Sequence, residues 1–446
     1  MAHYDFILNE GTALVFNEKT QQIESHILSL GLKAGKIASL MVQVSDTAEK
    51  TLNLKGLHIL PGVIDSQVHF REPGMIHKED LESGTRSALL GGITTIFEMP
   101  NTIPSTTTKE LFQDKLNRAE NRAHCNYAFF IGGSPENTQN LPELEKMDHC
   151  SGVKVFLGSS FGNLLVDDEG VFDQILKNGS RRVIIHSEDE QRLKERKQIA
   201  IDAGHPRAHS IWRDEQSALI STQKSIRLAQ KNNRPVHILH VSSSEEMEFL
   251  AQHKDISTVE ILPQYLTFHG PDCYERFGTL AQQNPPIRDA RHLEYLWKAV
   301  NNGTVDVIGS DHAPHTLEEK SKPYPQSPSG TPGVQTLLPV MLDHVYQKRL
   351  SLEKLTMLIT ENPRRVFGLK NKGRIAVGFD ADLTLVDLNK KMEIKNSWLA
   401  SKSKWSLFEG MNVTGWPVGA FVNGKLAVQD DQILIPHSGK PVWFNG

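Results

Sequence analysis

Short apolar segments alternate with longer helix-compatible stretches from residue 59 onward. The segments are rich in the β-branched and aromatic residues that are typical of buried strands. Because strands that alternate with helices favour a parallel sheet, eight such segments predict a (β/α)8 barrel of the α/β class, whose chemistry lies at the C-terminal strand ends. The eight segments are ILPGVID, GITTIFEMP, AHCNYAFFIG, GVKVFLG, RRVIIHSE, RPVHILHVSS, TVEILPQ and TVDVIGSDHAP.

Shorter strand-and-turn patterns occupy both ends of the chain. DFILNEGTALVF and HILSLGLKAGKIASL lie near the start, and GRIAVGFDADLTLVDL and PVGAFVNGKLAVQ near the end. Because the same pattern of short strands and turns occurs at both ends, we expect the two termini to form one small β-sandwich beside the barrel. A chain of 446 residues exceeds what one core usually supports, so we expect 1–58 and 370–446 in the sandwich and 59–369 in the barrel.

The composition limits which binding partners and which cellular location are expected. The net charge is −4 without a basic block, so nucleic acid is not an expected partner. No apolar run approaches the ~18 residues of a membrane span, and the start MAHYDFILNEGTALVF lacks the order of a signal peptide, so we expect a cytoplasmic protein. Three scattered cysteines predict neither a disulfide framework nor a zinc knuckle.

Polar side chains stand at the ends of several barrel segments, where interior positions are otherwise filled by branched apolar residues. In DSQVHFR, strand alternation directs every second residue into the barrel mouth. Imidazole and carboxylate donors from several strands, converging at one end, predict a divalent metal site. The polar residues at these strand ends, from which the site would be built, are Asp65, Gln67, His69, Arg71, Lys154, His186, His240, Asp311 and His315. His237, three residues before His240, points to another face and is expected to be structural.

The motifs resemble those of the dihydroorotase branch of the amidohydrolase superfamily, over nearly the whole chain. They are PGVIDSQVHFREPG, EMPNT, GVKVFLGSS, NPPIR, GSDHAPH and GRIAVGFDADLTLVDL. The resemblance implies one or two Zn²⁺ ions bridged by Lys154 carboxylated on its amine. His186 and His240 would hold the more exposed ion, and His69 and Asp311 the more buried one. A lysine in an apolar pocket has a depressed pKa, so its neutral amine can react with CO2.

The resemblance also implies the reaction, which is reversible hydrolysis of the cyclic amide of (S)-dihydroorotate to N-carbamoyl-L-aspartate in pyrimidine biosynthesis. A metal-activated hydroxide would attack the ring carbonyl, and Asp311 would carry the proton to the leaving nitrogen. Arg71, with Asn101 and His315, would bind the substrate carboxylate. The alternative for Arg71 is a salt bridge with Glu72. Asn284 would either position the ring or serve as a turn residue.

Gln67 departs from the His-x-His that this family usually has on the first strand. A neutral amide oxygen is a poorer zinc ligand than imidazole. Gln67 therefore indicates weak or water-mediated ligation, a site with one tightly held metal, or a protein that has lost activity.

Two other functions stay open. The first is a related cyclic amidohydrolase, of the hydantoinase, dihydropyrimidinase or allantoinase kind. The second is an inactive dihydroorotase-like scaffold that associates with aspartate transcarbamoylase. Whichever of these functions applies, we expect a homo-oligomer, either a dimer or a tetramer.

Overall fold

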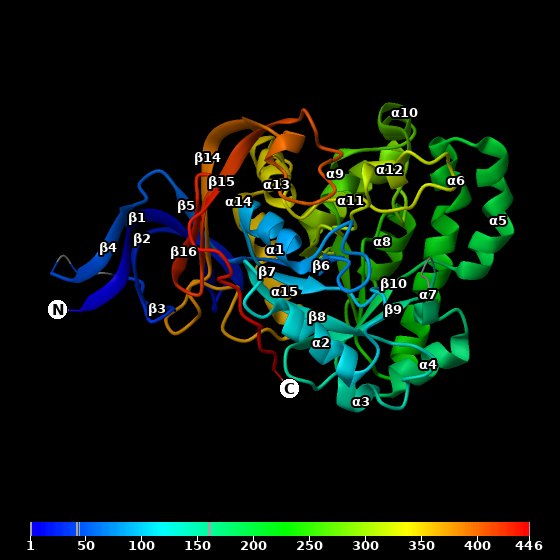
Figure 1. Ribbon diagram of the computed structural model, residues 1–446, viewed down its shortest axis with the longest axis horizontal. Helices are drawn as coiled ribbons and strands as arrows, with labels where there is room; N and C mark the ends of the chain where they lie inside the picture. Colours follow the sequence, from blue (N-terminus) through cyan, green and yellow to red (C-terminus); the bar gives the residue numbers. More distant parts are fainter. Residues whose placement is uncertain (1, 42, 44, 159–161, 446) are drawn as a thin grey trace.

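Eight parallel strands form a barrel at the centre of the molecule (Figure 1). The computed structural model describes residues 2–41, 43, 45–158 and 162–445, so Ser159 and Ser160 of the GVKVFLGSS motif lie outside the described residues. Each strand overlaps one of the eight apolar segments, which confirms the predicted barrel. The strands are β6 (Val63–Val68), β7 (Ile93–Glu98), β8 (Asn126–Gly132), β9 (Cys150–Phe156), β10 (Val183–His186), β11 (Val236–Ile238), β12 (Ser257–Ile261) and β13 (Val307–Ile308).

The first and last barrel strands meet beyond their C-terminal ends. Val68 and His312 form a parallel bridge, and the His69 amide donates to the His312 carbonyl at 2.8 Å. This contact brings the polar residues that follow β6 and β13 side by side.

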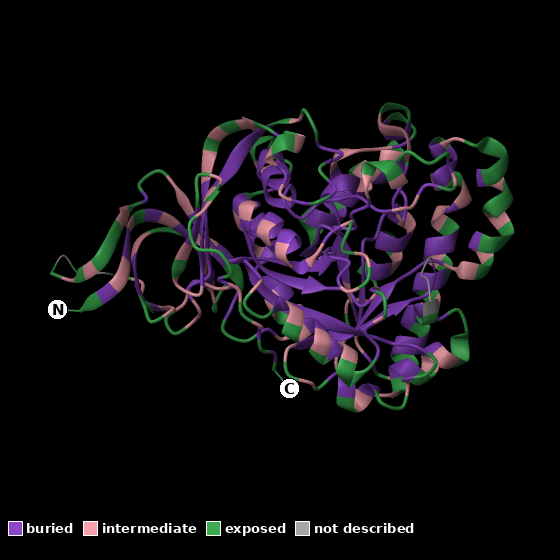
Figure 2. Cartoon of the chain, viewed as in Figure 1, coloured by how far each residue is buried: buried purple, intermediate pink, exposed green. Residues whose placement is uncertain are grey.

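Helices surround the barrel, with their inner faces buried and their outer faces exposed (Figure 2). Asp, Ser or Thr residues cap the N-termini of most of the longer ones, as Asp80 does for α1 and Asp214 for α7, so local sequence determines where these helices begin. The helices are α1 (Leu81–Leu90), α2 (Lys109–Ala119), α3 (Leu141–Leu144), α4 (Glu169–Lys177), α5 (Glu190–Ala203), α6 (His209–Trp212), α7 (Glu215–Lys231), α8 (Ser244–Ala251), α9 (Pro263–Thr267), α10 (Asp272–Phe277), α11 (Ala290–Asn302), α12 (Leu317–Lys320), α13 (Leu337–Tyr346), α14 (Leu352–Ile359) and α15 (Glu361–Phe367).

The two chain ends share a mixed sheet, the terminal sheet, beside the barrel (Figure 1). Its core contains Leu8, Leu30, Ile59 and Phe421. The apolar run ILPGVID is divided between the two sheets at Gly62, because β5 pairs with β1 and β14 whereas β6 enters the barrel. The domain limits expected above remain a proposal. The strands are β1 (His3–Asn17), β2 (Gln22–Lys33), β3 (Lys36–Ser39), β4 (Thr47–Asn53), β5 (His58–Pro61), β14 (Leu383–Glu393), β15 (Asn412–Val422), β16 (Lys425–Gln429) and β17 (Gln432–Ile433).

The last residues of the chain pack against the N-terminal end of the barrel. Val442 and Phe444 join an apolar cluster with Ile64, Phe97 and Phe130 of the barrel strands. Cys125, Cys150 and Cys273 are free and buried. Within the described residues, no helix is long and apolar enough to cross a membrane.

Candidate active site at the C-terminal strand ends

One cavity of about 270 Å³ at the C-terminal strand ends collects the predicted site residues. Polar groups from seven of the eight strands, or from the connections that follow them, therefore converge, although their sequence positions span more than half the chain. The residues that line it include Gln67, His69, Arg71, Asn101, Lys154, His186, His240, Asn284, Asp311 and His315. His237 is not among the lining residues and lies 2.8 Å from Thr258 Oγ1 through its Nδ1 atom.

The first group in the cavity is centred on the Asp311 carboxylate. Gln67 Nε2 donates to Asp311 Oδ1 at 2.9 Å, and His69 Nε2 lies 3.0 Å from the same oxygen. His69 Nδ1 lies 2.6 Å from Asn101 Oδ1. Burial lowers the pKa of His69, which favours the neutral imidazole with a single N–H. Because both ring nitrogens of His69 face oxygen atoms, a neutral His69 leaves one of these contacts without a proton.

The second group pairs His186 with His240. His186 Nδ1 and His240 Nε2 are 3.0 Å apart, and His186 Nε2 lies 2.8 Å from Glu188 Oε2. Burial alone would raise the pKa of Glu188, but Arg213 and His186 lower it to about 2. The carboxylate therefore fixes the N–H on His186 Nε2 and turns the Nδ1 lone pair toward His240.

Lys154, on β9, lines the same cavity. The residue is 1% exposed, and its Nζ atom has no hydrogen-bond partner among the described residues. Nζ stands 4.4 Å from the centroid of the Phe156 ring. Burial lowers the pKa of Lys154 to about 7, so a large fraction of the amine is neutral near neutral pH.

Comparisons with known proteins agree with the geometry. The Amidohydrolase family profile matches residues 58–427. The chain belongs to the amidohydrolase family. A dihydroorotase of Methanothermobacter thermautotrophicus is 31% identical over 419 residues, which cover 91% of this chain and 92% of that protein. An L-hydantoinase of Paenarthrobacter aurescens is 33% identical over 427 residues, 91% of each protein.

A solved amidohydrolase structure has the same fold over the full chain. The structure of L-hydantoinase (dihydropyrimidinase) from Arthrobacter aurescens has a TM-score of 0.92 at 30% identity, covering 99% of this chain and 100% of that one. The family and barrel expected from the motifs are confirmed. The two kinds of relative leave the particular substrate undecided.

Amidohydrolases are generally metal-dependent, and the donor set here suits a divalent cation. No three His, Cys, Asp or Glu side chains of the described chain already stand close enough to hold an ion. The lone pairs are nevertheless present in two pairs, His69 with Asp311 and His186 with His240, and the buried Lys154 amine lacks a partner. A cation bound among these groups would accept their lone pairs, which now face each other with no positive charge between them.

Arg71 also lines the cavity. Its side chain is buried, Nε donates to the Pro314 carbonyl at 3.3 Å, and Nη2 lies 3.4 Å from His315 Nε2. Glu72, the alternative partner considered above, turns away and pairs with Arg122 at 2.8 Å. Among described residues, no carboxylate lies within ion-pair distance of Arg71. Within the described residues, the alternative considered for Arg71, a salt bridge with Glu72, is therefore not formed.

Sequence reasoning missed two residues near the site, of which only Glu188 carried a signal in the sequence. Glu188 follows His186 by two residues, so strand alternation was a usable signal for it. Lys78 Nζ lies 3.1 Å from His315 Nδ1, but it comes from a loop without any periodic pattern.

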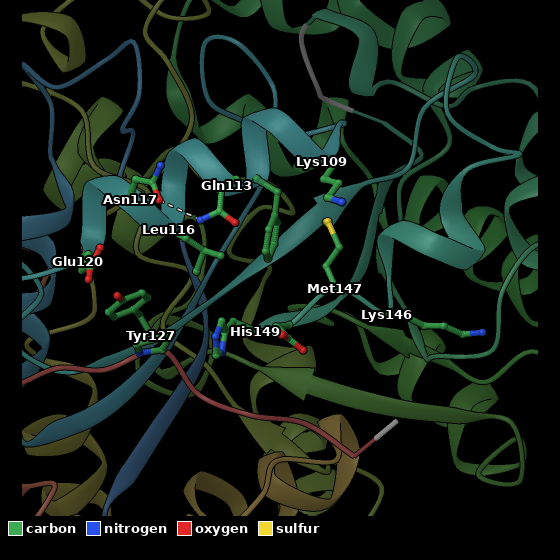
Figure 3. Close-up of a pocket in the computed structure, with 12 residues that line it drawn as sticks. Lys109, Gln113, Leu116, Asn117, Glu120, Tyr127, Lys146, Met147 and His149 are labelled. Carbon is green, nitrogen blue, oxygen red and sulfur yellow. Dashed lines mark hydrogen bonds between the residues drawn. The ribbon is translucent and has the colours of Figure 1, made fainter.

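A larger cavity, of about 590 Å³, lies beside the N-terminal ends of β8 and β9 (Figure 3). Tyr127, His149 and Met147 line it, and Gln113 donates to Asn117 at 2.9 Å. None of the predicted site residues lines this cavity, so it is not the candidate active site.

Proposed function

We propose that this amidohydrolase is a dihydroorotase, which reversibly hydrolyses the cyclic amide of (S)-dihydroorotate. The observation that carries the substrate choice is Arg71, a buried guanidinium in the cavity without a carboxylate partner among the described residues. Burying an unpaired cation costs free energy, so an anionic substrate group is the expected partner. Dihydroorotate supplies that carboxylate, whereas hydantoin and dihydrouracil rings do not.

The neighbouring amides support a substrate rich in oxygen acceptors. Asn101 Oδ1 faces His69, and Asn284 Oδ1 lies 2.9 Å from His209 Nε2. In each case the amide nitrogen is the group available to a ligand. With Arg71, beside which His315 lies, these donors match a carboxylate and ring carbonyl oxygens.

The chemistry proposed for the other residues follows from their donors. The proposed metal ligands, for one or two Zn²⁺ ions, are His69, Asp311, Lys154 as a carbamate, His186, His240 and, weakly, Gln67. When bound, the metal supplies Lewis-acid activation of water and of the amide carbonyl. Asp311 takes a proton from the attacking water and passes it to the ring nitrogen as the C–N bond breaks.

The test compares Arg71→Met with the wild type on two substrates. A bidentate contact in a desolvated pocket is strong, so the variant should lose about 2 to 5 kcal/mol in kcat/KM for dihydroorotate. Activity on uncharged dihydrouracil should change much less, because that ring presents no carboxylate. Equal losses on both substrates would make Arg71 structural and would remove the support for dihydroorotate.

The likeness to an L-hydantoinase makes hydantoin cleavage the second candidate. Wild-type protein that cleaves hydantoin and not dihydroorotate would establish it. Inactivity on both substrates in metal-replete protein would instead favour the scaffold role. A homo-oligomer and association with aspartate transcarbamoylase stay predictions.

A further inference from the structure

Lys320, at the end of α12, is a buried lysine without an anionic partner in the described part of the chain. Its exposed fraction is 0%, and no carboxylate in the described part of the chain pairs with it. Nζ donates instead to the carbonyl oxygens of Gln282 at 3.0 Å, Pro328 at 2.9 Å and Gly330 at 3.2 Å. An ammonium group has three donors, so these contacts use all of them.

The three carbonyls belong to two loops that are far apart in sequence and both reach the active-site cavity. Asn284 lines the cavity from one loop, and Pro328, Ser329 and Gly330 line it from the other. The loops are also joined directly, because the Gly330 amide donates to the Gln282 carbonyl at 2.9 Å. Lys320 therefore connects two parts of one wall.

The wall contacts His315, one of the residues proposed to bind the substrate carboxylate. His315 Nε2 lies 3.1 Å from the Ser329 carbonyl, and its Nδ1 lies 3.1 Å from Lys78 Nζ. Burial and the charges of Arg71, Lys78 and Lys320 lower the pKa of His315, so the ring is neutral. The neutral ring accepts from Lys78 and donates to Ser329, which fixes its position beside Arg71.

The loop that carries these carbonyls packs too tightly to move without breaking contacts. Gly330 has φ of 139°, and a Cβ atom there would lie 2.5 Å from the Ala313 carbonyl oxygen. Gly330 therefore lies directly against the backbone that follows Asp311.

We propose that Lys320 is a positioning residue, which locks the 282–284 and 327–330 loops together as the substrate-facing wall of the site. The proposal rests on the proposed function only for the identity of the substrate. It assigns Lys320 no contact with the reacting atoms. Its effect passes through the Ser329 carbonyl to His315 and through Gln282 to Asn284.

The experiment replaces Lys320 by Met, which keeps the length of the side chain and removes all three donors. Lys322→Met, two residues further on and exposed, is the matched control. Hydrogen exchange measured by mass spectrometry should rise in peptides over 281–285 and 323–332 of Lys320→Met, and stay unchanged in the terminal sheet. KM for dihydroorotate should rise about tenfold or more, with a smaller change in kcat, because a displaced wall misplaces the substrate.

A second variant and a second substrate keep the test decisive. Lys320→Gln, which keeps two N–H donors on a shorter side chain, should give intermediate exchange and KM, and it replaces the Met variant if that fails to fold. If the wild type cleaves hydantoin instead, the KM comparison uses hydantoin, and only the substrate assignment has failed. Unchanged local exchange and KM, or a loss of global stability alone, would overturn the positioning role.

Discussion

Three residues of the candidate site have left-handed backbone conformations. The φ angle is 64° at Arg71, 38° at His240 and 46° at Asp311. For a residue with a Cβ atom, such a conformation costs roughly 1 to 2 kcal/mol. Strain of this kind persists where the surrounding structure enforces it, commonly at functional sites. The strained residues thus stand at the strand ends where the sequence predicted functional residues.

Gln67 changes the surroundings of the Asp311 carboxylate. Its amide nitrogen donates to Asp311 Oδ1, which His69 also contacts, while Gln67 Oε1 has no hydrogen-bond partner among the described residues. A metal ion at Asp311 must therefore compete with an existing hydrogen bond. His186 and His240 meet no such competitor from Gln67.

Replacing Gln67 by His should strengthen the metal position at Asp311. An imidazole adds a nitrogen donor and removes the competing amide hydrogen bond. Zinc titrated into the metal-free wild type should bind in two unequal steps, and the weaker step should tighten about tenfold or more in Gln67→His. Isothermal calorimetry and metal content by mass spectrometry measure both quantities without an activity assay.

Lys154→Ala is the control for that titration, because it removes the proposed bridging group while both histidine positions remain. It should bind little metal with either residue at position 67. Two equal, tight steps in the wild type would contradict this role of Gln67, and full metal content in Lys154→Ala would contradict the carbamate bridge.

Sequence reasoning found residues whose type was unusual for their surroundings. Lys154 in an apolar strand and His69 in an alternating strand stand out because buried strands rarely contain such side chains. Lys320 does not stand out, since it follows two glutamates in an ordinary polar stretch. Its burial and its carbonyl partners arise from two loops that meet only in the folded chain.

At the level of elements, the strands were predictable and the connections were not. Eight apolar runs predicted eight barrel strands, but ILPGVID gave no sign that it serves two sheets. Short helices such as α6 and α12 have only one turn, which is too short for an amphipathic period. The packing of the C-terminal residues beneath the barrel depends on contacts with distant strands.

Phe444 should contribute to the stability of the barrel through that packing. It is 6% exposed, and its ring centroid lies 5.5 Å from that of Phe97. Phe444→Ala should lower the free energy of unfolding by about 3 kcal/mol, from lost burial and the cavity left behind. Urea unfolding measures the change. The neighbouring Trp443→Ala, at a residue that is 53% exposed, should cost less, and equal losses would contradict a buried anchor at Phe444.

Across the whole molecule, an ion-pair network joins the terminal sheet to the barrel helices. Arg374 Nε lies 2.6 Å from Glu361 Oε2, and Arg374 also pairs with Glu18 of the N-terminal hairpin. Arg364 contacts the same Glu361 carboxylate at 2.7 Å. The barrel and the terminal sheet were predictable from local pattern, but this junction was not, because Glu18 and Arg374 lie at opposite ends of the sequence.

The junction predicts a pH dependence of stability that can be assigned to one residue. Burial alone would raise the pKa of Glu361, but hydrogen bonds from Arg374 and Arg364 lower it below the ordinary value of 4.5. A carboxylate with a lowered pKa in the folded state stabilises that state above the unfolded pKa, and this stabilisation is lost as the pH falls through the folded pKa. The contribution of Glu361 should therefore be complete at pH 7 and should decline below about pH 4.5.

Glu361→Gln keeps the shape of the side chain and removes the charge. It should lower the free energy of unfolding by about 2 kcal/mol at pH 7, because two guanidinium groups lose a charged acceptor. Urea midpoints at pH 7, 5, 4 and 3 should show the wild type and the variant converging as the wild-type carboxylate is protonated. Glu143→Gln, at an exposed residue of α3, should follow the wild type at every pH. A constant difference between wild type and Glu361→Gln from pH 7 to pH 3 would show that packing, and not the charge of Glu361, joins the two parts of the molecule.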